Sequence, residues 1–230
     1  FQIALSTNDK KSWEKEDRGL SPTNMAMHVA LPEIDGRIFA GVASFKKKMP
    51  TDFKLQFNEI KHETYKDGIS SITQKVKSWI KLQNTSLKMK KPAVILSTYP
   101  GKKWQIAHAV GLDTISSVKE ILEYLKFIKK NENIDIINNL NNKKIKWPIS
   151  SYRKALKNIS KKLKDDLFKK WGDPELDPNC VNQNFIFKGF YIKNSLIALQ
   201  PNRSDTKSKK NDYHDLDLVP SHSYVAFYLW

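Results

Sequence analysis

The stretch PAVILSTYP, Pro92–Pro100, is a short apolar run bounded by prolines and long enough for one buried strand. A polar loop follows it. The next segment, SSVKEILEYLKFIKK, places apolar residues on one face of a helix, namely Val118, Ile121, Leu122, Leu125 and Ile128. Ser117 and Glu120 have the spacing of a capping box at its start. A strand, a loop and a helix in this order predict a βα unit of a parallel sheet at about 92–130, Rossmann-like in type.

Upstream of this unit, the least polar long segment is Pro22–Lys46, and its apolar run Met27–Leu31 predicts a buried strand. The strand would end at LPEIDGR, residues 31–37, where Pro32 removes a backbone donor and Gly36 allows a sharp turn. Open α/β sheets usually bind ligands at such strand ends. Glu33, Asp35 and Arg37 would stand there, although charges at a strand exit can also simply meet solvent.

Between these two segments, alternating apolar residues in Asp52–Tyr65 predict an exposed strand. Apolar residues at helical spacing in Gly68–Gln83 predict a helix with a lysine-bearing outer face.

Downstream of the βα unit, Ser150–Trp171 has helical periodicity, possibly in two pieces, and WGDPELDP ends it with two prolines and a glycine. FIFKGFYIKNSLIALQP predicts a hairpin that turns at Lys193–Asn194. Tyr224–Trp230 predicts a last apolar strand.

We therefore expect an α/β fold: a mixed or parallel sheet with flanking helices plus an antiparallel hairpin region. We divide the chain into three segments, residues 1–85 with LPEIDGR, 86–150 with the βα unit, and 151–230 with the helical part, hairpin and final strand.

Composition limits the broad class of the protein. The 230 residues carry a formal charge of +16, mostly from lysine spread along the chain, which predicts a solvated surface more than a nucleic-acid groove. One cysteine, Cys180, excludes an internal disulfide and fits a reducing compartment, so a cytoplasmic location is expected. The sequence lacks an initial Met and ends on an apolar run, from which we expect a piece of a larger protein.

Several common sites are excluded by their motifs. The only Gly-Lys pair, Gly101–Lys102, lacks the other residues of a P-loop, and neither G-x-G-x-x-G nor a C-x-x-C zinc pair occurs. The five histidines are His28, His62, His108, His214 and His222. The last two flank an acidic turn, and that spacing could serve a metal ion or a proton relay. The others fit core or surface positions.

Six stretches, taken together and in order, resemble the large subunit of the ATP-dependent metal chelatases: SPTNMAMHVALPEIDGRI, KKPAVILSTYP, IAHAVGLDTISSVKEIL, WGDPELDP, LIALQPNR and YHDLDLVPSHSYVAFYLW. This family includes the cobaltochelatase large subunit and the porphyrin-binding subunit of magnesium chelatase. GRI at 36–38, YHD at 213–215 and AFYLW resemble the cobalt branch. The resemblance implies Co²⁺ insertion into hydrogenobyrinic acid a,c-diamide in cobalamin biosynthesis, with ATP hydrolysed by a separate AAA+ subunit that works with an integrin-like partner.

The resemblance also assigns roles to residues. Metal insertion removes the inner N–H protons of the macrocycle, so a positioned base is needed. Glu33 is the candidate base or metal relay, and His214 and His222 are the candidates for metal delivery. The substrate-binding candidates are Asp35, Gly36, Arg37, Gln200 and Arg203, where the arginines would pair with substrate carboxylates.

Some features depart from the family pattern. Ser204 stands where the family has glycine, and the family continues beyond the last segment into a His- and Gly-rich part of the site. We therefore expect this chain alone to be inactive. The alternatives are a magnesium chelatase subunit that inserts Mg²⁺ into protoporphyrin IX, a truncated non-catalytic tetrapyrrole-binding or partner-docking protein, and a basic nucleic-acid-binding domain.

Overall fold

The computed structural model describes residues 1–16, 19–54, 56–97, 111–204 and 217–230. These residues form two compact units, Phe1–Thr85 and Ser86–Trp230. Each unit has its own sheet. No helix in the described ranges is long and apolar enough to cross a membrane.

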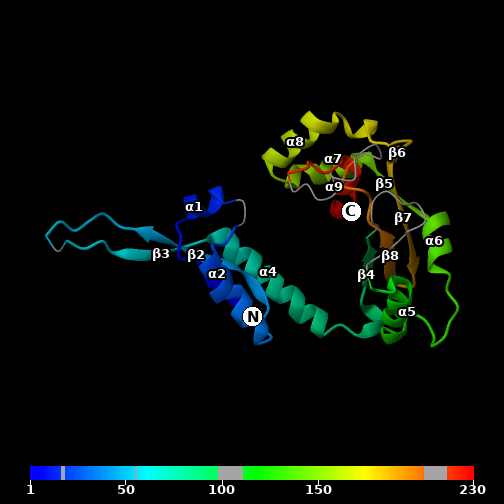
Figure 1. Cartoon of the computed structure of the whole chain (residues 1–230), viewed down its shortest axis with the longest axis horizontal. Coiled ribbons are helices and arrows are strands. Elements are labelled where there is room, and N and C mark those ends of the chain that lie inside the picture. Colours follow the sequence, from blue (N-terminus) through cyan, green and yellow to red (C-terminus); the bar gives the residue numbers. More distant parts are fainter. Residues whose placement is uncertain (17–18, 55, 98–110, 205–216) are drawn as a thin grey trace. The chain divides into compact units, whose positions relative to one another are not determined.

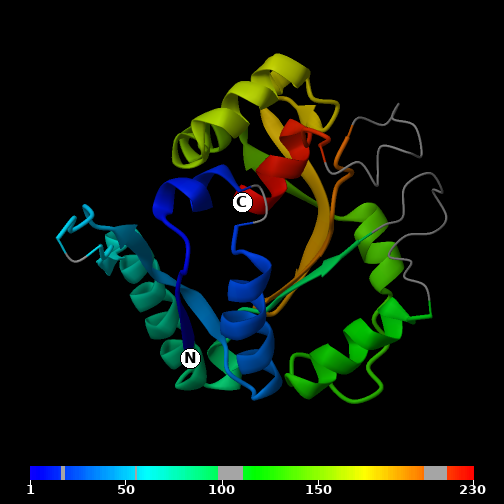
Figure 2. The same cartoon turned by 60° about the vertical axis from the view of Figure 1, so that its left-hand side comes forward.

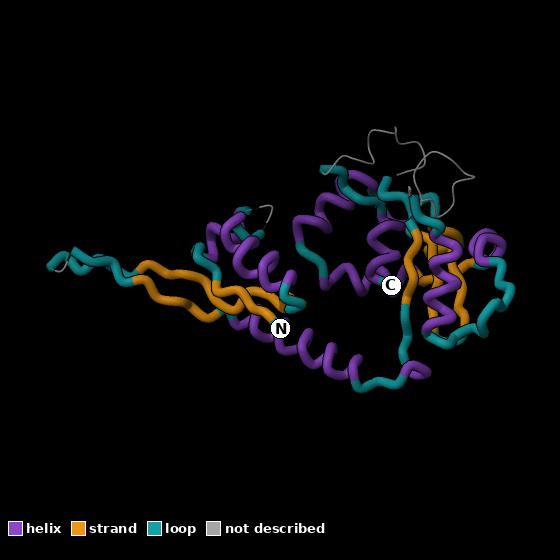
Figure 3. The backbone as a smooth tube through the Cα atoms, turned by 60° about the horizontal axis from the view of Figure 1, so that its bottom comes forward, coloured by secondary structure: helices purple, strands orange, loops and turns teal. Residues whose placement is uncertain are grey.

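The first unit is built on a mixed three-stranded sheet of order β1-β2-β3, formed by β1 (Gln2–Leu5), β2 (Phe39–Lys48) and β3 (Ile60–Thr64). β1 pairs with β2 in parallel, and β3 pairs with β2 antiparallel. Within this unit, helix α4 (Lys66–Gln83) lies on one side of the sheet and the helical segment that starts at Pro22 lies on the other (Figure 3). α4 confirms the helix predicted over Gly68–Gln83. The exposed strand predicted over Asp52–Tyr65 is regular only in β3.

The strand predicted at Met27–Leu31 is wrong, because this segment is helical. α2 (Pro22–Met25), the π-helical turn η1 (Ala26–Ala30) and α3 (Leu31–Ile34) follow one another without a break. Ser21 caps the start, where its side chain accepts a hydrogen bond from the Asn24 N–H. Pro32 offers no N–H and its ring would meet the carbonyl of a regular α-turn. The wider π-turn, in which Leu31 N–H donates to Ala26, immediately precedes that proline.

Close packing joins α4 to β2 in the first unit. The side chain of Ile72 already lies 3.0 Å from the position that a β-carbon would take at Gly41 on β2. At Gly68 on α4, a β-carbon would overlap the carbonyl oxygen of Val42 and the ring of Tyr65. The rings of Trp13, from α1 (Lys10–Lys15), and Tyr65 both pack on Phe45, at 5.2 and 5.4 Å between centroids. Two glycines therefore set the helix-to-sheet distance.

The second unit holds a mixed sheet of order β4-β8-β7-β5. β6 pairs with the first two residues of β7, on the edge of β7 opposite to β5. Its strands are β4 (Ala93–Leu96), β5 (Lys144–Pro148), β6 (Cys180–Val181), β7 (Asn184–Ile192) and β8 (Ser195–Leu199). Among the described strands of this sheet, β4 and β8 alone pair in parallel. The predicted α/β class with a mixed sheet and a hairpin is confirmed: β7 and β8 turn at Lys193–Asn194, where Lys193 has φ +50°. The sheet draws strands from both 86–150 and 151–230.

Helices cover both faces of this sheet (Figures 1 and 2). Phe190 and Ile197 point to one face, where they pack with α5 (Thr114–Tyr124) and α6 (Ile136–Asn142). Phe185 and Phe187 point to the other face, toward α7 (Ile149–Ala155), α8 (Lys161–Trp171) and α9 (His222–Leu229). This alternation along β7 and β8 follows from the two-residue period of a strand.

Three details of the second unit bear on the sequence predictions. The helix of the βα unit is confirmed as α5, but its cap is Asp113, which accepts from Ser116 N–H, and the predicted Ser117 capping box is wrong. The predicted helix over Ser150–Trp171 is confirmed in two pieces, α7 and α8, which the turn η3 (Leu156–Asn158) separates. Gly172, with φ +72°, ends α8 before the turn η4 (Pro174–Leu176).

The strand predicted at Tyr224–Trp230 is also wrong, because these residues form α9. The Ser221 hydroxyl accepts from Tyr224 N–H and caps the helix. A short, wholly apolar run is compatible with a buried strand or a buried helix, and periodicity alone cannot separate them. Here Val225, Ala226 and Phe227 are all buried in the apolar cluster that α7, α8 and α9 form against the sheet. A strand on an exposed edge would turn alternate side chains to opposite faces and would not bury all three.

We predict that Gly68→Ala destabilises the first unit by about 2–3 kcal/mol, because the added methyl overlaps the Val42 carbonyl. In an open helix site, Gly→Ala stabilises by up to about 1 kcal/mol, so the sign of the change reports the close packing. Urea unfolding of the chain measures it. Ser70→Ala, on an exposed position of the same helix, is the control and should change stability little. An unchanged or raised midpoint for Gly68→Ala would contradict the packing described.

Candidate functional site

The LPEIDGR motif, residues 31–37, forms a helix end in the first unit. Gly36 takes φ +75°, its N–H donates to Glu33 O at 2.9 Å, and Arg37 N–H donates to Pro32 O at 2.9 Å. This pair of bonds is a Schellman motif, in which glycine is favoured because of its left-handed backbone. Gly36 therefore has a structural role, whatever else it does.

The charged side chains of this motif all reach solvent. Glu33 and Asp35 are exposed, and Asp35 is the C-cap of α3. Arg37 is exposed too, and its Nη1 donates to Gln2 Oε1 at 3.5 Å. Within the described residues, no group of three or more His, Cys, Asp or Glu side chains is arranged to hold a metal ion. The motif thus presents two carboxylates and a guanidinium on the surface of the first unit.

In the second unit, the carboxyl ends of the parallel strands β4 and β8 meet at one edge of the sheet. Gln200, just after β8, donates its N–H to Leu96 O of β4 at 2.8 Å. Its side-chain amide lies between two tyrosines of α9: Nε2 donates to the Tyr224 hydroxyl at 3.4 Å, and Oε1 accepts from the Tyr228 hydroxyl at 3.0 Å. This edge is where open α/β sheets bind ligands.

The two tyrosines offer a partly exposed aromatic surface at this edge. Their ring centroids lie 5.0 Å apart with the ring planes inclined by 57°, and Tyr228 is 54% exposed. Partial burial and the hydrogen bond to Tyr224 raise the pKa of Tyr228 to about 12, so its hydroxyl keeps its proton at neutral pH. Gln200 was predicted from sequence, whereas Tyr224 and Tyr228 were not singled out.

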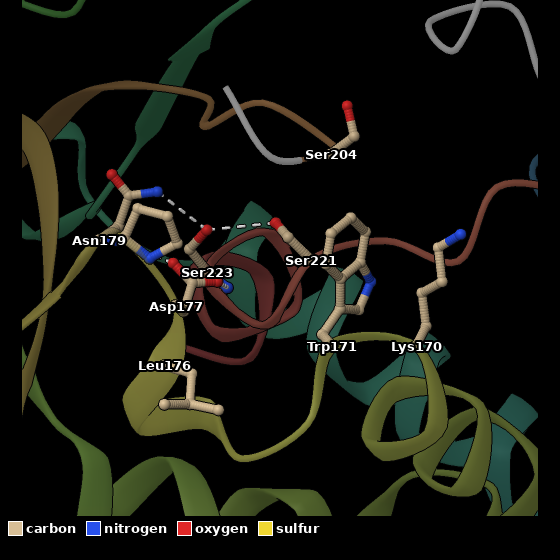
Figure 4. Close-up of a pocket in the computed structure, with 9 residues that line it drawn as sticks. Lys170, Trp171, Leu176, Asp177, Asn179, Ser204, Ser221 and Ser223 are labelled. Carbon is tan, nitrogen blue, oxygen red and sulfur yellow. Dashed lines mark hydrogen bonds between the residues drawn. The ribbon is translucent and has the colours of Figure 1, made fainter. Parts of the chain in front are cut away.

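A pocket of about 190 Å³ lies beside the N-terminus of α9 (Figure 4). The residues that line it come from the end of α8, the WGDPELDP turn, the residue after Arg203 and the start of α9: Lys170, Trp171, Leu176, Asp177, Pro178, Asn179, Ser204, Ser221 and Ser223. Six of them belong to two of the stretches that carry the family resemblance, WGDPELDP and the last one, whereas Lys170, Asn179 and Ser204 stand directly beside quoted stretches. The fold thus collects at one place segments that lie far apart in the sequence.

Asp177 holds the pocket together. This buried carboxylate is 8% exposed; its Oδ2 accepts from Ser223 N–H of α9 at 2.8 Å, and its Oδ1 accepts from Asn179 N–H at 2.9 Å. The first bond places a negative charge at the N-terminus of α9, where the helix dipole favours it. Asn179 Nδ2 also donates to the Ser223 hydroxyl at 3.1 Å. One carboxylate therefore ties the WGDPELDP turn to α9.

His222, a predicted metal-delivery residue, is fully buried in the described structure. Its Nε2 lies 3.1 Å from Gly172 O, and its Nδ1 lies 2.8 Å from the Tyr152 hydroxyl. A carbonyl can only accept, so Nε2 carries the proton and Nδ1 accepts from Tyr152. Burial lowers the pKa of His222, which keeps the ring neutral. Both nitrogens are therefore engaged, and a metal could bind only if one of these bonds opened.

Of the remaining predicted residues, Arg203 contacts the segment that leads into α9. Arg203 Nη2 donates to Leu218 O at 3.4 Å, and its carbonyl accepts from Ser221 N–H. His214 lies outside the described residues. Glu33, Asp35, Gly36 and Arg37 belong to the first unit, whereas Gln200, Arg203 and His222 belong to the second.

Sequence reasoning missed the side chains that line the pocket. Asp177, Ser221 and Ser223 sit in stretches quoted for the resemblance and Asn179 directly follows one, but none has a motif that marks it. The only local signal is a Ser-x-Ser pair next to an apolar run, which also predicts an ordinary helix cap.

Comparisons with known proteins find similarity to one family along nearly the whole chain. The sequence model of a family described as CobN/Magnesium Chelatase matches residues 1–230. The aerobic cobaltochelatase subunit CobN of a Sinorhizobium species is 28% identical over 99% of this chain and 19% of its own length. The chloroplastic magnesium-chelatase subunit ChlH of indica rice is 22% identical over 98% of this chain and 17% of its own.

A solved structure matches as well. The catalytic subunit of cobaltochelatase from Mycobacterium tuberculosis superposes with a TM-score of 0.73 at 25% identity, covering 96% of this chain and 20% of that one. The chain spans about a fifth of the length of these relatives.

We predict that the chain loses stability as the pH falls from 7.5 to 5, and that His222 contributes to this loss. The pKa of His222 is lowered in the fold, so the unfolded chain binds the proton first as the pH drops below the ordinary histidine value of about 6.5. The stabilisation is present above that pH and is lost as the pH falls through the folded pKa. Urea unfolding at several pH values measures the slope.

Two variants separate the causes of this slope. His222→Gln should lower stability at pH 7.5 and flatten the dependence on pH. Tyr152→Phe should cost about 1 kcal/mol through the lost hydrogen bond yet keep the slope, because the histidine stays buried. An equally steep slope in His222→Gln would show that other groups cause it.

Proposed function

The chain belongs to the CobN/magnesium chelatase family, and from this premise we propose that it is part of the tetrapyrrole- and metal-handling subunit of an ATP-dependent cobaltochelatase. The reaction is Co²⁺ insertion into hydrogenobyrinic acid a,c-diamide, which forms metal–nitrogen bonds. The observation that carries this proposal is the match of the family over all 230 residues, with higher identity to a cobaltochelatase subunit than to a magnesium-chelatase one.

The described geometry supports a binding role for the second unit. The carboxyl edge of β4 and β8 carries the Gln200–Tyr224–Tyr228 group, and α9, which supplies both tyrosines, also borders the pocket at its N-terminus. Aromatic rings can stack on a flat macrocycle, while the amide and hydroxyls around them offer hydrogen bonds. Arg203 follows the same strand and is our candidate for pairing with a substrate carboxylate.

The first unit would supply the chemistry at the metal. Glu33 is our candidate base or metal relay, since it is an exposed carboxylate with no hydrogen bond that would hold it away from a ligand among the described residues. Asp35 and Arg37 follow it in the same motif and would orient substrate. Co²⁺ is a substrate here, and His214 remains our candidate for its delivery; His222 could join only after its bond to Tyr152 or Gly172 opens.

The proposal also includes two separate partner subunits. A separate AAA+ subunit would hydrolyse ATP and an integrin-like subunit would connect it, as the family resemblance implies. We also propose that the chain alone does not insert metal. A magnesium-branch function remains the second candidate, because a magnesium-chelatase subunit also matches nearly the whole chain.

The first test offers the assembled complex two substrate pairs: Co²⁺ with the corrin precursor, and Mg²⁺ with protoporphyrin IX. We expect turnover of the cobalt pair, read from the absorbance change of the macrocycle, and only in the presence of ATP. Turnover of the magnesium pair alone would assign the chain to the other branch. Binding of a tetrapyrrole without turnover of either pair would leave a non-catalytic binding protein.

The second test is Glu33→Gln in the same complex. We expect metal insertion to slow by about a hundredfold or more with substrate affinity little changed, because loss of a general base costs about 10²–10⁴ in rate. Asp35→Asn, two residues away and also exposed, is the comparison variant: as a substrate-binding residue it should weaken binding of the substrate and slow insertion at saturating substrate much less. Unimpaired insertion by Glu33→Gln removes this residue from the mechanism.

A further inference from the structure

The pocket beside α9 is too small for a whole macrocycle. Its volume is about 190 Å³, whereas pockets that enclose a whole drug-sized ligand span roughly 300–1,000 Å³. A space of this size fits one side chain that projects from a larger ring. The chemistry of the lining therefore indicates which side chain it takes.

Part of the pocket lining is apolar. Trp171 Nε1 donates to Val219 O at 3.1 Å, which sets the orientation of the indole. Leu176 and Pro178, which flank Asp177 in sequence, add further apolar surface, and Leu176 is 74% exposed, so a ligand that enters would cover it. Such apolar surface suits the methylene stem of a side chain.

The pocket lining also offers both acceptors and donors. A carboxylate has about four lone-pair sites, and two backbone N–H groups use one on each oxygen of Asp177. Asp177 can therefore accept further N–H donors. The hydroxyls of Ser221 and Ser223 stand beside it, 3.2 Å from each other, and Figure 4 shows both grouped with Asp177 and Asn179. Hydroxyls can rotate to donate to a ligand oxygen.

The charge of Asp177 disfavours an acid in this pocket. A ligand carboxylate would meet the carboxylate of Asp177 in a buried setting, where like charges repel strongly. The nearest lysine, Lys170, lies over the Trp171 indole with its ammonium 5.9 Å from the ring centroid, and Figure 4 draws it beyond the indole as seen from the serines. A primary carboxamide carries no charge, donates N–H to Asp177 and accepts from a serine hydroxyl.

We propose that this pocket is a recognition site for one carboxamide side chain of the macrocycle, and that Asp177 is the residue that selects the amide over the acid. The inference rests on the proposed function, since it assumes a tetrapyrrole ligand. It deepens that function by naming a specificity-determining residue in the second unit. A macrocycle that bears only carboxylates would bind less tightly at this position.

The test compares two ligands of the assembled complex: hydrogenobyrinic acid a,c-diamide and hydrogenobyrinic acid, its parent without the amides. Dissociation constants come from fluorescence quenching. We expect the wild type to bind the diamide about tenfold more tightly than the parent acid, a ratio typical of one hydrogen bond to a charged group. Asp177→Asn should reduce this preference to less than about threefold, chiefly by tighter binding of the acid.

Two further variants supply a control and an independent test of the pocket. Asp173→Asn is the matched control, because Asp173 also accepts a backbone N–H in the same turn but pairs with Arg153 and does not line the pocket. It should keep the full preference. Ser223→Ala leaves the backbone bond to Asp177 intact and should weaken binding of the diamide severalfold, which tests the pocket even if Asp177→Asn unfolds.

The outcomes separate this proposal from the function on which it rests. Binding of both ligands by the wild type with no preference, or an unchanged preference in Asp177→Asn with unchanged diamide binding in Ser223→Ala, overturns the amide site and leaves the proposed function standing. Binding of neither ligand by the wild type overturns the proposed function itself.

Discussion

The bond from Ser223 N–H to the buried carboxylate of Asp177 connects two segments that are 46 residues apart in sequence. It satisfies a backbone N–H in the first turn of α9 that has no acceptor within the helix, and it places a negative charge where the helix dipole is positive. Because α9 is fixed this way, its two faces have distinct roles. The inner face carries His222 and the apolar residues of the core, and the outer face carries Tyr224 and Tyr228 toward Gln200.

The same geometry explains why His222 is a core residue in the described structure. Its ring lies between Tyr152 and Phe168, in edge contacts of 5.8 and 5.4 Å between centroids. Both nitrogens have partners, so the histidine satisfies its polar atoms inside an apolar cluster. His222, which resembles a metal-delivery residue in sequence, thus connects α9 to α7 and to the end of α8 through its two hydrogen bonds. A histidine next to an acidic turn in sequence need not face that turn.

Much of the fold follows from local patterns. The amphipathic periodicity of α4 and α5, the break at Gly172 and the turn at Lys193–Asn194 are all visible in the residues, since each depends on neighbours within a few positions. The two strands that proved to be helices, Met27–Leu31 and Tyr224–Trp230, are short apolar runs. Such runs carry no period that separates a buried strand from a buried helix.

By itself, the sequence determined the α/β class, the family and the motif that carries Glu33, because these depend on composition, local spacing and an ordered set of stretches. Only the tertiary structure decided that LPEIDGR closes a helix, that His222 is buried, and that Asp177, Asn179 and Ser223 share one pocket. These side chains come from segments that meet because the sheet and its helices bury apolar faces. Contacts set by such burial leave no trace in the spacing of the residues that make them.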